Sequence, residues 1–93
     1  MYATDFILEQ WSEADLLEYA IGAYALRHPG IKGRQGIAGI CGISVMTLSN
    51  VISGQSHLGD ENWLKIDEEI GEPLHDRWYN VQREKMIRGR LER

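Results

Sequence analysis

The chain has 93 residues, and 14 acidic against 10 basic side chains give it a net charge of −4 near neutral pH. This length supports a single small domain, and a hydrophobic content of 43% is enough for one core. A single cysteine excludes an intrachain disulfide framework and a cysteine-based zinc site. No apolar run approaches the ~18 residues that a membrane span needs, and no signal pattern opens the chain. We therefore expect a cytoplasmic protein with no membrane partner.

The N-terminal third predicts one clear helix. Residues 1–11 form an extra segment, with one or two helical turns expected around Phe6. Ser12 is a suitable N-cap, and Asp15, three residues later, can complete a capping box. Apolar residues then recur at helical spacing until Pro29, which ends the helix.

Two short helices follow, separated by a glycine. One is expected over residues 34–41 and the other from an N-cap at Ser44 to about Ile52. Gly42 between them suits a turn that needs positive φ. Gly36 and Gly39 are expected on the outer face of the first helix, where each costs about 1 kcal/mol relative to alanine. This helix is therefore intrinsically weak.

The C-terminal third predicts two more helices. Asp60 is the expected N-cap of a helix that buries Trp63 and ends at Gly71. Pro73 is expected in the first turn of a last helix, which runs from about residue 74 to residue 91. No segment has the pattern of a strand. The predicted fold class is all-α: a compact bundle of about five short helices in a single domain.

The two short helices carry the residues that a helix-turn-helix needs at fixed offsets. Over residues 34–53, the unit requires an apolar anchor and then a small residue in the first helix, glycine and an apolar residue in the turn, and two apolar anchors in the second helix. These positions are filled in that order by Ile37, Ala38, Gly42, Ile43, Leu48 and Val51. The sequence therefore predicts a helix-turn-helix at residues 34–53.

This segment resembles the Cro/C1-type, lambda-repressor-like helix-turn-helix family. The likeness lies in Ile37-Ala38, Gly42-Ile43-Ser44, Thr47-Leu48-Ser49 and the closing Ser53-Gly54. The stretch from Gly59 to Trp63 is also similar to the N-terminal domain of Mu-type transposition ATPases. The resemblance implies a small regulator of a phage or mobile element, or a transposition-targeting domain, bound to double-stranded DNA and then associated with the nucleoid.

The resemblance also implies a set of DNA-binding residues. The front of the second helix would offer Asn50 for a bidentate contact with adenine and hydroxyl groups for base edges or phosphates. The start of the first helix would supply phosphate contacts and positive charge. The candidate residues are Lys32, Arg34, Gln35, Ser44, Val45, Met46, Thr47, Ser49, Asn50 and His57.

A second function stays open because Val45 and Met46 are apolar where family members often carry Gln, Arg or Lys. Such a pair weakens base readout and equally suits a protein-protein interaction module built on a helix-turn-helix scaffold. The third class, an enzyme, is not expected: no acid, base and nucleophile are clustered, and no phosphate loop is present. No cofactor or metal site is expected either.

Other polar residues have less specific interpretations. His57 follows the second helix and is interpreted either as a phosphate contact or, more simply, as a solvated loop residue. The acids of residues 67–76, and those of the N-terminal helices, are expected on solvated faces. Cys41 is expected to pack as a small hydrophobic residue. Residues 77–93 form a basic helix that contacts phosphates, a helix that forms a homodimer, or a solvated tail.

The net charge is unevenly distributed. Residues 1–30 carry −4, residues 31–59 carry +2 with no acid, residues 60–76 carry −6, and residues 77–93 carry +4. The predicted helix-turn-helix is thus the acid-free stretch of an acidic chain, and the basic C-terminal segment could join it. Any DNA surface is local and thinly charged, so non-specific affinity should be weak.

Overall fold

The computed structural model describes residues 5–91, and within them the chain is helical and has no strand. Six helices occur there, one of them in the N-terminal segment that was set apart from the predicted bundle. They are α1 (Asp5–Gln10), α2 (Glu13–Arg27), α3 (Gly33–Cys41), α4 (Val45–Ile52), α5 (Asp60–Ile70) and α6 (Leu74–Leu91). The predicted all-α class is confirmed.

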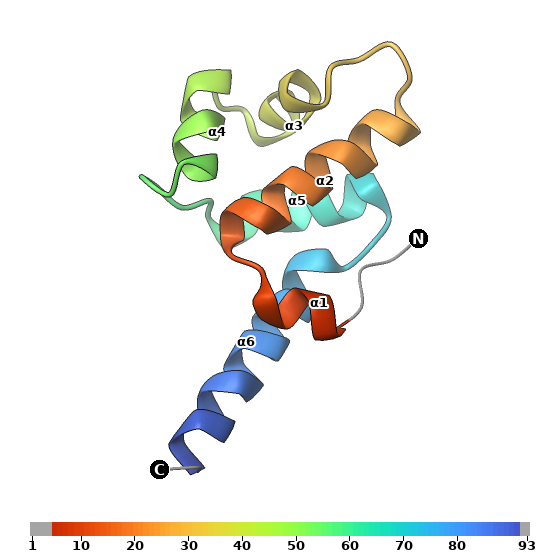
Figure 1. Ribbon diagram of the computed structural model, residues 1–93. Coiled ribbons are helices and arrows are strands. Elements are labelled where there is room, and N and C mark those ends of the chain that lie inside the picture. The colour runs from red at the N-terminus through yellow and green to blue at the C-terminus, as the bar shows by residue number, and fades with distance from the viewer. Residues whose placement is uncertain (1–4, 92–93) are drawn as a thin grey trace.

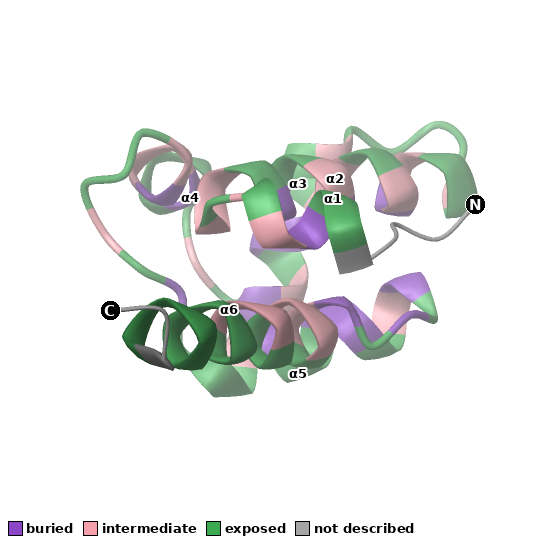
Figure 2. Ribbon diagram, turned by 60° about the horizontal axis from the view of Figure 1, so that its bottom comes forward, coloured by how far each residue is buried: buried purple, intermediate pink, exposed green. Residues whose placement is uncertain are grey.

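The helices lie in three tiers (Figure 1). The middle tier consists of α2 and α5, with α3 and α4 on one side of it and α1 and the start of α6 on the other. The second half of α6 projects away from the body, and the longest dimension of the molecule is 48 Å. The exposed turns of this projecting half stand out in Figure 2.

The core is apolar and is built around Trp63, whose side chain is completely buried. Its ring stacks on His75 of α6 with the ring centroids 5.1 Å apart. Burial lowers the pKa of His75, so this imidazole is neutral at neutral pH. The remaining fully buried large side chains are Leu8, Leu16, Leu17, Ile37, Leu48, Ile66 and Leu74.

Most helix ends follow the predicted capping pattern. The hydroxyl of Ser12 accepts from the amide of Asp15, whose carboxylate accepts in return from the amide of Ser12 at 3.0 Å. Gly42 and Gly71 end their helices with φ of +67° and +72°, in the left-handed region that favours glycine.

Two predictions at the α5 and α6 starts are wrong by one residue. Gly59 is the N-cap of α5, so Asp60 lies in the first turn. Its negative charge there still interacts favourably with the helix dipole. Pro73 precedes α6 rather than lying inside its first turn. Proline lacks an amide hydrogen, so this position adds no unpaired donor to the start of α6.

The close packing of α3 on α2 depends on two glycines. A Cβ atom at Gly33 would lie 2.6 Å from the carbonyl oxygen of Ile21, and one at Gly36 would overlap the ring of Tyr24. The expected outer position of Gly36 is therefore wrong: this glycine faces α2. Gly39 has open space around its Cα, as expected.

Some acids expected on solvated faces are buried and partnered. Asp67 is 8% exposed and Glu72 is 5% exposed. Both carboxylate oxygens of Asp67 accept from the backbone amide of His75. Asp67 thereby caps the start of α6. Glu72 accepts from the hydroxyl of Tyr19 at 3.1 Å and from the guanidinium of Arg77 at 3.2 Å. These acids fix helix ends rather than coat a surface.

Glu13 is a further correction to the expected solvated acids. Its carboxylate accepts from the indole N–H of Trp63 at 3.0 Å and from the amide of Leu58 at 3.3 Å. A buried indole needs an acceptor, and a charged acceptor makes the stronger bond. Glu13 therefore joins the start of α2 to α5 and to the loop before it.

Side chains of α6 complete the C-terminal end of α1. The indole N–H of Trp78 donates to the carbonyl of Trp11 at 2.8 Å, and the side-chain amide of Gln82 donates to the backbone carbonyl of Leu8 at 2.9 Å. Lys85 donates to the carbonyl of Glu9 at 3.3 Å. The last carbonyls of a helix have no partner within it, so these bonds stabilise a helix too short to persist alone.

The contrast between the two α3 glycines gives a stability test. Gly39→Ala should stabilise the protein by up to about 1 kcal/mol, because alanine is the better helix former. Gly36→Ala should destabilise it by about 1–3 kcal/mol, because the buried ring of Tyr24 blocks the added methyl group. Chemical denaturation of both variants measures the sign of each change in the free energy of unfolding. Equal signs would contradict this packing of α3 on α2.

Asp67 gives a pH test. Burial is the main cause that raises the pKa of its carboxyl from 3.8 to about 6. Between these values the folded state keeps a proton that the unfolded state has lost, so stability falls as the pH rises from about 4 to 6. Asp67→Asn retains an oxygen for the His75 amide but does not titrate.

Relative to wild type, the free energy of unfolding of Asp67→Asn should rise by about 2–3 kcal/mol between pH 4 and pH 7. Denaturation at both pH values measures this double difference. Glu68→Gln, at an exposed position of α5, is the matched control. An Asp67→Asn profile parallel to that of wild type would show that the Asp67 carboxyl titrates alike in the folded and unfolded states.

Candidate nucleic-acid interface

Helices α3 and α4 have the geometry of a helix-turn-helix. Their axes bend by 104° across the three-residue turn 42–44, within the range of about 90–120° for this motif. Leu48 and Val51 anchor α4 in the core, at 0% and 2% exposure, and Ile37 anchors α3 at 0%. The apolar anchors that the sequence pattern predicts are therefore confirmed as buried residues.

The outer face of α4 is apolar at the start of the helix. Met46 is 71% exposed and Val45 is 41% exposed. Ser49 and Asn50 are half-buried on the same helix, and Asn50 lies one turn after Met46 on the side away from Leu48. This face offers an amide for hydrogen bonding, a hydroxyl group and a methionine, all without charge.

The hydroxyl groups of Ser44 and Thr47 are already engaged in capping α4. Ser44 accepts from the amide of Thr47 at 3.0 Å, and the two hydroxyl oxygens lie 2.9 Å apart. Because one hydroxyl donates to the other, only one O–H of the pair remains available to an outside acceptor. The DNA contacts predicted for Ser44 and Thr47 are thus reduced to one hydrogen-bond donor at the start of α4.

The basic residues lie at the start of α3. Lys32 is the N-cap, and Arg34 and Gln35 are in the first turn; all three are exposed. No side chain caps this helix start, so its first amides are not satisfied by a cap. Amides and cations together make this end of α3 a favourable location for a phosphate group.

His57 is exposed, but it is not simply a solvated loop residue. Its Nδ1 lies 2.8 Å from a carboxylate oxygen of Glu13, whose other oxygen binds the Trp63 indole and the Leu58 amide. The side chain of His57 is 86% exposed, so its Nε2 edge faces outward. A phosphate contact through that edge stays a prediction.

Glu13 is the positioning residue that the sequence did not reveal. Its bonds fix the loop after α4 and so the side chain of His57. The sequence signal was present but ambiguous, because an acid in the first turn after a serine cap is also typical of a solvated helix start. Only the packing of α5 against α2 shows that the indole of Trp63 points at this carboxylate.

Cys41 ends α3 beneath the turn, and it is 7% exposed. Burial raises the pKa of its thiol, which is therefore neutral at neutral pH. It packs as a small hydrophobic residue, as expected.

The basic C-terminal segment does not join this surface. Residues 74–91 form α6, which leaves the body at the end opposite α3 and α4 (Figure 1). Its base packs on α1 and α5. Within one chain α6 does not extend the surface of α3 and α4, because its docking on α1 directs it away from them.

No group of three or more histidine, cysteine or acidic side chains is placed to hold a metal ion within residues 5–91. No single helix in the described part of the chain is long and apolar enough to cross a membrane. Helices α3 and α4 reach that length and apolar composition only when they are added together, and a bend of 104° separates them.

Comparison with known proteins gives no relative. No family model, no curated protein and no solved structure matches the chain.

Proposed function

We propose that the protein binds double-stranded DNA through α3 and α4, with α4 in the major groove. The observation that carries the proposal is the 104° bend between these helices across a three-residue turn, with both helices anchored in the core. A helix-turn-helix of this shape presents its second helix to base edges while the first crosses the backbone. A role as a small regulator or as a transposition-targeting domain rests on the sequence resemblance.

The charges around the motif favour contact with a polyanion at this end of the molecule. Residues 31–59 contain Lys32 and Arg34 and no acid, whereas the chain as a whole is acidic. Two phosphate contacts give little non-specific affinity. Sequence preference then comes from the face of α4, where Asn50 can bind adenine and Met46 can pack on a thymine methyl group.

A second candidate function is supported by the exposure of Met46 and Val45. Large apolar side chains on an exposed helix face are typical of surfaces that bind proteins, and methionine adapts to different partners. In this alternative the helix-turn-helix is a scaffold, and α4 docks on an apolar surface of another protein.

The DNA function predicts two distinct mutant phenotypes. A selection on random duplexes first supplies a preferred site. On that site Asn50→Ala should weaken binding by about 1–3 kcal/mol, while its binding to unrelated duplexes stays as in wild type. Lys32→Ala should weaken binding to all duplexes alike.

Salt dependence sharpens this test. With two phosphate contacts, the slope of log K against log salt should be about −2, and Lys32→Ala should make it shallower by about 1. Asn80→Ala, at the α6 end of the molecule, is the matched control for Asn50→Ala and should leave affinity and slope unchanged. Absence of any duplex binding at low salt would refute the DNA function.

Met46→Asp separates the two candidate functions. Met46 is 71% exposed, so the substitution should leave the free energy of unfolding within about 0.5 kcal/mol of wild type. If α4 is a protein-docking surface, a partner captured by wild type should be lost with Met46→Asp but retained with Lys32→Ala. A partner bound equally by Met46→Asp would exclude the α4 face as its binding site.

A further inference from the structure

The outward face of α6 carries a second patterned surface. Tyr79, Arg83, Met86 and Arg90 follow one another at intervals of four, three and four residues, which places them on one side of the helix. This side faces away from the residues that dock on α1. Tyr79 is 57% exposed and Met86 is 62% exposed. Neither arginine forms a hydrogen bond or an ion pair with any residue in the described range 5–91.

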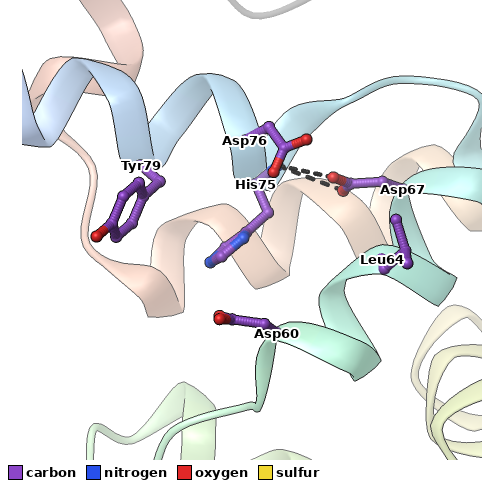
Figure 3. Close-up of a pocket in the computed structure, with 6 residues that line it drawn as sticks. All are labelled: Asp60, Leu64, Asp67, His75, Asp76 and Tyr79. Carbon is purple, nitrogen blue, oxygen red and sulfur yellow. Dashed lines mark hydrogen bonds between the residues drawn. The ribbon is translucent and has the colours of Figure 1, made fainter.

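The same face begins at an acidic hollow. A cavity of about 450 Å³ lies between α5 and the first turns of α6. Figure 3 shows the residues that line it: Asp60, Leu64, Asp67, His75, Asp76 and Tyr79. Asp60 and Asp76 are exposed at its rim, and Leu64 is 59% exposed. Asp60, Asp67 and Asp76 make the lining acidic, and the neutral imidazole of His75 does not offset their charge.

The two halves of this face are complementary to each other. One half is acidic with exposed Leu64 and Tyr79, and the other is basic with exposed Met86. They are displaced along the axis of α6, since Asp76 and Met86 lie about 15 Å apart at 1.5 Å per residue. Within one chain they cannot meet, because a straight helix separates them.

We propose that this face binds a second copy of the chain, with the two α6 helices antiparallel about a two-fold axis. Only the antiparallel arrangement places each basic half over the acidic half of the other copy; a parallel arrangement places like charges together. With the axis near residue 81, Arg83 of each copy lies over the ring of Tyr79 of the other copy. Met86 then lies over the hollow, and Arg90 reaches its acidic rim.

This homodimer does not depend on the DNA function, since α6 and the helix-turn-helix lie at opposite ends of the molecule. The face is small, and its contacts depend on the positive charges of Arg83 and Arg90. We therefore expect a dimer that forms at micromolar concentration and weakens with salt.

Charge reversal tests the proposal. Sedimentation equilibrium should show a dimer for wild type at low salt. Arg83→Glu with Arg90→Glu should raise the dissociation constant by about tenfold or more, because like charges then face each other across the interface. Both positions are exposed on the projecting half of α6, so the fold is not at risk. Lys32→Glu with Arg34→Glu makes the same charge change at the other end and should leave the dimer intact.

A mixing experiment tests the antiparallel arrangement itself. Asp60→Lys with Asp76→Lys should also give a monomer. Mixed in equal amounts, the two α6-face variants should form a heterodimer, because each reversed half again meets an opposite charge. A monomeric wild type at all salt concentrations would overturn the proposal, as would a dimer that survives the Arg83 and Arg90 reversals. Loss of duplex binding in a monomeric arginine variant, with wild type also monomeric, would assign α6 to nucleic acid instead.

Discussion

The bond between the indole of Trp63 and the carboxylate of Glu13 is the interaction on which the rest of the structure depends. Trp63 is fully buried, so its N–H needs an acceptor inside the protein, and Glu13 supplies it at 3.0 Å. The same carboxylate holds the amide of Leu58 and the ring of His57, which fixes the chain between α4 and α5. One face of the indole is covered by His75, so this tryptophan side chain joins α2, α5 and α6.

The position of the helix-turn-helix follows from a different constraint, the close approach of α3 to α2. Gly33 and Gly36 remove the side chains that would keep the two helices apart, at a cost in helix propensity. α3 is thus a weak helix that exists because α2 and α5 support it, and α4 follows through the turn at Gly42. The exposed face of α4 depends in this way on contacts made on the opposite side of the motif.

Local sequence signals predicted the helices and most of their ends, because caps and apolar periodicity act over a few residues. Ser12 with Asp15, and the glycines at 42 and 71, are examples. Long-range packing was not predictable. No local sequence signal indicates that Gly36 contacts Tyr24 or that Glu13 binds the indole of Trp63. Asp67 and Glu72 appeared to be surface acids because their partners, the amide of His75 and the hydroxyl of Tyr19, are set by tertiary structure. The candidate interface could be located from spacing, but the internal bond between Ser44 and Thr47 could not.

The charge along the long axis alternates, positive at the α3–α4 end, negative through α5 and positive again at the tip of α6. A polyanion attracts both positive ends of the molecule, so either tip can arrive first. If the protein binds DNA as proposed, a free monomer would also meet a duplex unproductively through α6. The proposed pairing of the α6 helices would cover that competing end, so that diffusing molecules would approach a duplex only through α3 and α4.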